Sequence, residues 1–333
     1  MRTRILLLLL AALLLGCSFS LAVPVASVET AALTAAPVTA SIAPTETPAP
    51  TPEPTPTAEP TPEPTETPVP TPEPTPTPRF ADKFITGEPV VTEDSYQSER
   101  VAIFLTHIQD DSGTFSRYPL AYHMADIYLK EPTDFRAAFT NEDFRYKYAY
   151  PMASIVESNN ALLAISGDFI RFRSTGLCVR NGTVYRTVHD PTRDVCVFYR
   201  DGHIEMFDAD ATPVDTILSD PEVWHVIGFG PSLLDENGKA KESFHTSVAG
   251  HNPRAVIGYY EPGHYALLYV EGRQEGYSQG LRMEGLSKLC ESLGFTAAFN
   301  LDGGNTAGMY FCGNPVGRHV SKRELHDIFY IAY

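Results

Sequence analysis

The sequence predicts a β-rich fold with few helices, preceded by a long segment that does not fold. Two hairpin signals, Asn181-Gly182 and Asp201-Gly202, each join short stretches in which polar and apolar residues alternate. The stretch 161–165 (ALLAI) is a continuous apolar run of strand length. A clear helical spacing of leucine and methionine occurs over 280–293, before Gly294.

Charge and proline content limit the possible functions. The net charge of −16 argues against a nucleic-acid partner, because phosphate backbones are bound by clustered Lys and Arg. It leaves room for a small phosphate ester held by one or two arginines. Most of the 28 prolines lie between Pro37 and Pro78, so the folded part is much shorter than the 333-residue chain.

The N-terminus is predicted to direct export. Two arginines, an apolar run over 5–15 and small residues after it are typical of a signal peptide over 1–17. The run is shorter than the roughly 20 residues of a membrane span. Residues 14–17 (LLGC) also resemble a bacterial lipobox, which implies a lipid on Cys17 and an anchor on the outer face of the cell membrane. The alternative is a secreted protein that is cleaved after Ala22 or Ala26.

Residues 18–79 are predicted to be a disordered stalk. From 44 to 78 the pattern Thr-Pro-Glu-Pro repeats imperfectly, with little apolar area to bury. Proline favours an extended spacer of about 3.1 Å per residue, reaching on the order of 100 Å, which could carry O-glycans. We interpret it as a stalk holding a domain away from the membrane; a proline-motif ligand is the alternative.

The folded domain is expected over 80–333. Strands are expected over 96–105, 118–129, 161–165, 176–180, 183–186, 196–199, 203–207, from Arg254, over 265–270 and over 327–333. Helix is expected over 152–160 and 280–293, and a short helical or coil segment over 135–139. The loop around Phe229 should enter the core, and a turn is expected over 235–238.

Two acidic loops follow apolar runs. The run 295–299 leads to Asn300 and Asp302, then to two glycines, Asn305 and Thr306. Glycine allows close approach of a ligand to the backbone, although Asp-Gly is also a common hairpin turn. The other loop is Ser166-Gly167-Asp168-Phe169. On an extended chain, Arg171 and Arg173 would share the face of Phe169, although a structural or surface role is more usual for them.

Several motifs together resemble the phosphodiester glycosidase family over about residues 90–333. They are Asn252-Pro253-Arg254, Glu271-Gly272-Arg273, Ser278-Gln279-Gly280 and Asn300 to Gly304, with supporting segments at 167–169, 229–233 and 323–327. The resemblance implies an α+β fold with mixed sheets and few helices. It also implies hydrolysis of a sugar-1-phosphodiester at the sugar–oxygen bond. The chain departs from the family in Glu271, where Asp is common, and in Asn305, where a third glycine is common.

The resemblance places the family's acid, arginine and glycine positions on Asp168, Arg254, Arg273, Asp302, Gly303 and Gly304. Asp168 and Asp302 are the expected catalytic pair, with Glu271 as a supporting or alternative acid. Arginine binds phosphate bidentately, and glycine N–H groups can form an anion-binding concavity. The residues predicted to bind the substrate and its phosphate are Arg254, Arg273, Ser278, Asn300, Gly303, Gly304, Asn305 and Thr306.

Structural interpretations compete with these roles. Asp302 could cap a turn, and Asp168 could accept backbone hydrogen bonds at a strand end. No His pair has the spacing of a transition-metal site, so no metal or cofactor is predicted, although carboxylates leave a hard divalent ion as an alternative. Four cysteines besides Cys17 allow three disulfide connectivities, of which Cys178–Cys196 with Cys290–Cys312 is favoured over free thiols.

Two functional hypotheses follow. The first is an exported hydrolase that cleaves a sugar phosphodiester in cell-envelope or environmental glycans. The second is a cell-wall module that binds a phosphoglycan without cleaving it. The presence of Asp168, Arg254 and Asp302 together favours the enzyme, because a binding module has no need of a pair of acids.

Overall fold

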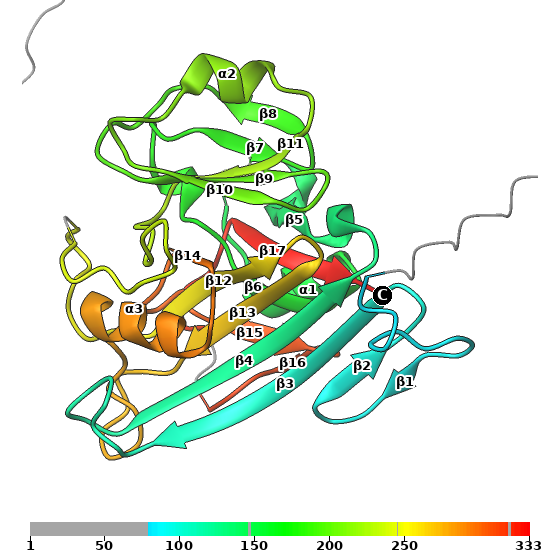
Figure 1. Cartoon of the computed structure of the whole chain (residues 1–333), viewed down its shortest axis with the longest axis vertical. Helices are drawn as coiled ribbons and strands as arrows, with labels where there is room; N and C mark the ends of the chain where they lie inside the picture. Colours follow the sequence, from blue (N-terminus) through cyan, green and yellow to red (C-terminus); the bar gives the residue numbers. More distant parts are fainter. Residues whose placement is uncertain (1–78, 146–147, 245, 319–320) are drawn as a thin grey trace, which may run out of the picture. The chain divides into compact units, whose positions relative to one another are not determined.

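The structure is a computed structural model, in which residues 79–145, 148–244, 246–318 and 321–333 are described (Figure 1). The predicted signal peptide, Cys17 and the stalk, apart from its last residue Arg79, lie outside these residues. Within the described ranges, no helix has the length and apolar character that crossing a membrane requires.

The described strands form three sheets in which the pairings are antiparallel. The first sheet has the order β1 (Val90–Val91), β2 (Ser95–Gln97), β3 (Val101–Asp110), β4 (Leu120–Leu129), β13 (His264–Val270), β12 (Arg254–Glu261), β14 (Ala297–Asn300). The second has the order β16 (Asn314–Pro315), β15 (Met309–Phe311), β6 (Ala161–Ser166), β17 (Asp327–Ala332), β5 (Arg136–Phe139). The third has the order β10 (Ile204–Phe207), β9 (Val195–Tyr199), β11 (Val223–Ile227), β7 (Cys178–Arg180), β8 (Thr183–Arg186).

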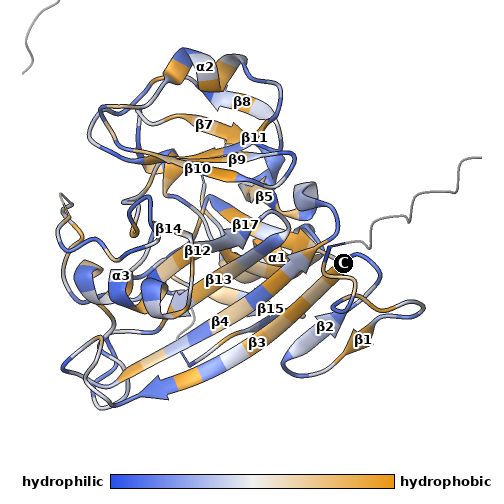
Figure 2. Cartoon of the chain, viewed as in Figure 1, coloured by the Kyte–Doolittle hydropathy of each residue, from blue (hydrophilic) through white to orange (hydrophobic). Residues whose placement is uncertain are grey.

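The helices are few and short. In the part of the chain that the structure describes they are α1 (Met152–Ser158), α2 (Val214–Ser219) and α3 (Met283–Ser292), with 3-10 turns at Pro132–Asp134, Thr140–Glu142 and Ile170–Phe172. The expected α+β class is therefore confirmed, although the sheets are antiparallel where mixed sheets were expected. Figure 2 shows hydrophobic and hydrophilic bands alternating along β3 and β4, as expected for strands with two unlike faces.

Side-chain alternation explains how the layers pack. In β13, Tyr265, Leu267 and Tyr269 point into the main core, whereas Ala266, Leu268 and Val270 pack with the apolar side of α3. In β17, Phe329 and Ile331 point into the same main core, and Ile328 and Tyr330 pack with α1. The first and second sheets therefore enclose one core between them, with α3 outside the first and α1 outside the second (Figure 1).

Local signals predicted many elements correctly. Asn181 and Gly182 both have positive φ, 51° and 74°, in the hairpin that joins β7 to β8. The hairpin between β9 and β10, the buried strand β6 and helix α1 also lie where expected. Helix α3 ends before Gly294, whose φ of 79° suits the residue that follows a helix.

Three expectations about the chain path were wrong. Residues 136–139 form strand β5, because their backbone pairs with β17 far along the sequence. The single strand expected over 96–105 is a hairpin of β2 and β3. The segment after Phe169 is a 3-10 turn, so Arg171 and Arg173 are not on an extended chain.

The favoured disulfides were also wrong, since Cys178, Cys196, Cys290 and Cys312 are free. Strand β11 lies between the strands that carry Cys178 and Cys196. Two strand spacings are about 9–10 Å, beyond the reach of a disulfide. Cys290 packs in the cluster under α3, whereas Cys312 packs against the main core.

Candidate functional site

The candidate site lies where ends of strands from different sheets meet. Strand β6 ends at Ser166, β14 ends at Asn300, and β17 begins at Asp327. The Asp302 N–H donates to the Gly167 carbonyl at 3.1 Å, and the Gly167 N–H donates to the Asp327 carbonyl at 3.1 Å. The turn after Asp302 leads from the first sheet into β15 of the second, so the hairpin interpretation of Asp302-Gly303 was wrong.

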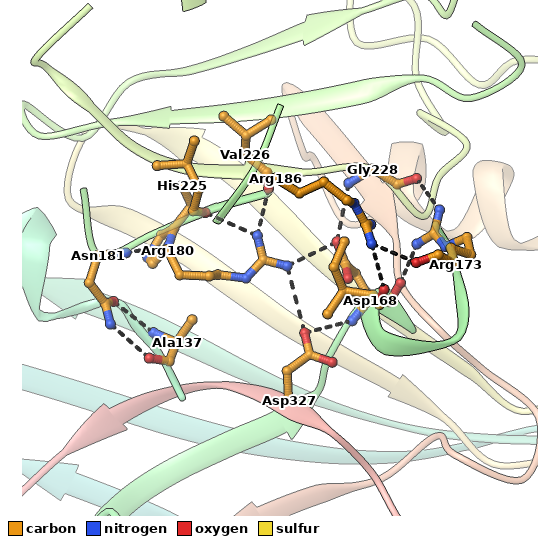
Figure 3. Close-up of polar contacts among 12 residues, drawn as sticks. Ala137, Asp168, Arg173, Arg180, Asn181, Arg186, His225, Val226, Gly228 and Asp327 are labelled. Atoms are coloured by element: carbon orange, nitrogen blue, oxygen red, sulfur yellow. Dashed lines mark hydrogen bonds and ion pairs between the residues drawn. The ribbon is translucent and has the colours of Figure 1, made fainter. Parts of the chain in front are cut away.

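A buried arginine from the third sheet holds two of the acids (Figure 3). Arg180 Nη2 lies 2.9 Å from Asp168 Oδ2 and 3.6 Å from Asp327 Oδ2. Asp168 Oδ2 also accepts from the Gly228 N–H, and the Asp168 N–H donates to Asp327 Oδ2. The three side chains are at most 3% exposed, so their charges must compensate one another.

The surroundings shift the pKa values of two acids upward. Burial, with the nearby Asp168 carboxylate, raises the pKa of Asp327 well above its ordinary value, despite the opposing Arg180. Burial likewise raises the pKa of Asp302 to about 6, although hydrogen bonds from Thr306 and Gly303 and the charge of Arg323 oppose this. Asp302 and Asp327 are therefore acids that can hold or release a proton near neutral pH.

Asp302 and Asp327 border one small pocket. Its lining is Ser166, Gly167, Phe169, Phe172, Asp302, Thr306, Glu324, Leu325, His326 and Asp327. Its volume of about 10 Å³ has room for about one water molecule. Asp168 does not line it, whereas Asp327 does, so of the expected catalytic pair only Asp302 borders this pocket.

Glycine is required at two positions by close packing. A Cβ on Gly167 would lie 2.3 Å from the Asp327 carboxylate, and one on Gly303 would lie 2.6 Å from the Pro253 carbonyl oxygen. The N–H groups of Gly303 and Gly304 are already engaged, by the Asp302 carboxylate and the Pro253 carbonyl. Gly303 and Gly304 therefore let the turn after Asp302 pack closely against Pro253, and their N–H groups do not form the expected anion-binding concavity.

Of the two arginines predicted to bind phosphate, only Arg273 is exposed. Its Nη1 donates to Asn305 Oδ1 at 2.6 Å and its Nη2 to Asn252 Oδ1 at 2.7 Å. These two amides hold the guanidinium beside the turn that carries Asp302. Arg273 thus presents an exposed guanidinium, with Asn305 and Asn252 as its braces.

Arg254 lies in the interior and is 2% exposed. It donates to three backbone carbonyls: Nε to that of Leu281 at 2.9 Å, and Nη2 to those of Val248 at 2.8 Å and Gly250 at 2.5 Å. These bonds tie β12 to the segments on either side of it. The expected phosphate contact is replaced in this structure by a structural role.

Glu271 does not join the other acids. It is fully buried, where it accepts from His123, Gln274 and the Arg318 N–H at 2.7–3.0 Å. Burial alone would raise the pKa of Glu271, but these hydrogen bonds lower it to about 2. Glu271 therefore stays ionised and braces the turn that presents Arg273.

The remaining predicted residues divide between support and site. Ser278 Oγ donates to the Glu271 carbonyl at 2.7 Å, and Asn300 Nδ2 donates to the Gly230 carbonyl at 2.8 Å. Both side chains are fully buried. Thr306 lines the pocket and hydrogen-bonds the Asp302 carboxylate, so it belongs to the site.

Sequence reasoning missed the importance of Arg180 and Asp327. Arg180 is the last residue of a buried strand, and Asp327 is the first residue of the otherwise apolar strand β17. The sequence did contain a signal for both residues: each is a charged residue at a position where the apolar pattern predicts burial. Among the described residues, no group of three or more His, Cys, Asp or Glu is arranged to hold a metal ion.

Comparisons with known proteins identify the family and the fold. A model of the phosphodiester glycosidase family matches residues 159–332. The catalytic domain of zebrafish N-acetylglucosamine-1-phosphodiester alpha-N-acetylglucosaminidase, auto-inhibited by its pro-peptide, matches with a TM-score of 0.55 and 17% identity. That match covers 70% of this chain and 83% of the zebrafish chain, and it shows a shared fold.

Two further solved structures are less similar. A hypothetical protein from Synechocystis has a TM-score of 0.47 and 14% identity, over 70% of this chain and 62% of its own. An exported protein from Burkholderia pseudomallei has a TM-score of 0.43 and 14% identity, over 66% of this chain and 75% of its own. A search of curated proteins found no match.

Proposed function

Because the chain belongs to the phosphodiester glycosidase family, which indicates hydrolase activity on phosphodiester-linked sugars, we propose that it cleaves the bond between a sugar C1 and the phosphate oxygen. One observation carries the proposal. Asp302 and Asp327 face the same small pocket, and both have pKa values raised toward neutrality. Paired carboxyl groups of this kind are what glycosidic hydrolysis uses.

The proposed reaction uses the water-sized pocket. Asp302, ionised above pH of about 6, takes a proton from a water whose oxygen attacks the sugar C1. The C1–O bond breaks, its electron pair passes to the phosphate oxygen, and Asp327 donates a proton to that oxygen. The products are a free sugar and a phosphate monoester. Asp168 and Arg180 position Asp327, and Arg273 offsets the phosphate charge.

The proposed setting is the cell surface. The signal-peptide pattern supports export, and the lipobox ending in Cys17 supports a lipid anchor. The proline-rich composition of residues 18–79 supports a stalk. A glycan phosphodiester of the cell envelope or the surroundings is therefore the proposed substrate. N-acetylglucosamine-1-phosphodiesters are the first compounds to assay, because the zebrafish protein of similar fold is named for them.

An isotope experiment tests both the activity and the bond that is cleaved. The purified protein is incubated with a GlcNAc-1-phosphodiester in ¹⁸O-labelled water, and the products are analysed by mass spectrometry. The proposal requires the label in the sugar. Label in the phosphate would identify a phosphodiesterase instead, and binding without product would identify the phosphoglycan-binding module.

The pH dependence should be bell-shaped. The rate should rise as Asp302 loses its proton near pH 6, and it should fall at higher pH as Asp327 loses the proton that it donates. The measurement is kcat between pH 4 and 9 for wild type and Asp327→Asn. The variant should be slower and should lack the alkaline fall while keeping the acid one. A wild-type rate that does not change between pH 5 and 7 would contradict the role of Asp302.

A further inference from the structure

Two phenylalanines line the rim of the pocket, and the exposure of one of them, Phe172, has no core-packing explanation. The Phe172 ring is 54% exposed, yet it lines the same pocket as Asp302 and Asp327. It stacks on the Phe169 ring with centroids 4.4 Å apart and an angle of 22° between the ring planes. Burial in a core cannot account for a ring that is more than half exposed.

The backbone below the rings is strained. Phe169 has φ 60° and ψ 25°, a left-handed conformation that bulky side chains rarely adopt. This conformation begins the 3-10 turn that sets the ring of Phe172 against that of Phe169. Such strain persists only where the surroundings impose it, and it is frequent at ligand sites.

Neighbouring groups impose this conformation. Arg173 Nη2 donates to the Asp168 carbonyl at 2.5 Å, immediately before Phe169. The Phe172 ring makes a T-shaped contact with the ring of His326, the neighbour of Asp327, with centroids 4.9 Å apart. A contact to the Asp168 backbone and one to His326 therefore hold the aromatic pair beside the buried acids, with Phe172 exposed to solvent.

We infer that Phe172, backed by the Phe169 ring stacked against one of its faces, forms a platform on whose other face the sugar ring of the substrate stacks, so that its C1 faces Asp302. The inference rests on the proposed function. A pyranose has a face of C–H groups with its hydroxyls around the rim, and the negative face of an aromatic ring attracts such C–H groups. The platform thus binds the sugar, whereas the exposed Arg273 is left to bind the phosphate.

This arrangement also predicts a source of selectivity. A sugar with equatorial hydroxyls presents only C–H groups to the platform. An epimer with an axial hydroxyl on that face would lose the contact and bury a polar group against Phe172. The platform should therefore discriminate between epimers by binding rather than by chemistry.

The inference is tested by measuring KM and kcat on the glycosyl phosphodiester for three variants: Phe172→Ala, Phe172→Tyr and the control Tyr118→Ala. Tyr118 is an exposed aromatic that does not line this pocket. Phe172→Ala should raise KM about 3- to 10-fold, the factor expected for an aromatic contact, and leave kcat within about 2-fold. Phe172→Tyr should restore KM, Tyr118→Ala should not change it, and the preference between epimers should disappear in Phe172→Ala alone.

Binding of the free methyl glycoside by calorimetry separates this inference from the proposed function. An inactive wild type would refute the hydrolase but would leave this measurement readable. A KM and a glycoside affinity that are the same in Phe172→Ala and wild type would overturn the platform. So would a loss in Phe172→Ala that Phe172→Tyr does not restore.

Discussion

Asp302→Asn is expected to abolish sugar release. The variant keeps the shape of the side chain but cannot accept a proton from water, and loss of a general base lowers rates by about 10²- to 10⁴-fold. The measurement is kcat/KM on a glycosyl phosphodiester, with substrate affinity measured separately by calorimetry. Activity equal to that of wild type would remove Asp302 from the catalytic site.

The same substitution should stabilise the fold at alkaline pH. Burial raises the pKa of Asp302 from its ordinary value of 3.8 to about 6, so the folded state disfavours the carboxylate. The contribution of protonated Asp302 to the free energy of unfolding is fully present below pH of about 4. It is lost as the pH rises through 6. Asn has no proton to release, so the variant avoids this loss. Its free energy of unfolding at pH 8 should exceed that of wild type by on the order of 2 kcal/mol.

Urea unfolding at pH 4 and pH 8 measures this difference. The gain should be present at pH 8 and absent at pH 4, since wild-type Asp302 is itself mostly protonated at pH 4. A variant that is inactive and equally destabilised at both pH values would show that Asp302 supports the fold rather than the reaction.

Arg180→Met is expected to cause the largest loss of stability. Asp168 and Asp327 would stay in the interior without their buried cation, and breaking a buried ion pair costs about 3–5 kcal/mol. The hydrogen bond from Nη1 to the Val226 carbonyl would be lost as well. Urea unfolding at pH 7 gives the change in the free energy of unfolding.

Arg145→Ala is the matched control for this loss. Arg145 pairs with Asp143 at 3.5 Å, but its side chain is 87% exposed. Exposed ion pairs contribute about 0–1 kcal/mol, so this variant should unfold almost as wild type does. Equal effects of the two substitutions would mean that the buried network of Asp168, Arg180 and Asp327 is not what stabilises the site.

The sequence predicted the elements that depend on neighbours along the chain. The two hairpins follow from turn residues that tolerate positive φ, and α3 follows from its apolar spacing and Gly294. Strand β5 could not be predicted in this way, because its hydrogen-bond partners in β17 are about 190 positions away. Pairing across such a distance is decided by the whole core, not by local preference.

The candidate site shows the same division. Asp302 and Arg273 could be selected from motifs, and their side chains lie at the pocket and beside its turn. Arg254 has the same residue type and a similar motif, but its partners are carbonyl groups of Val248, Gly250 and Leu281. A one-dimensional pattern does not record whether a guanidinium faces backbone or solvent. Asp327 and Arg180 depend likewise on a contact between the second and third sheets.

The meeting of strand ends at the site has a consequence for heat inactivation. The loops at Gly167 and Asp302 and the start of β17 are joined by direct backbone hydrogen bonds, so no one of them can melt while the others keep their geometry. Fraying of a single edge would leave most enzymes partly active. Here the catalytic groups and the central strands β6 and β17 should be lost in one cooperative step. Residual activity during a temperature ramp should therefore report the fraction of folded molecules.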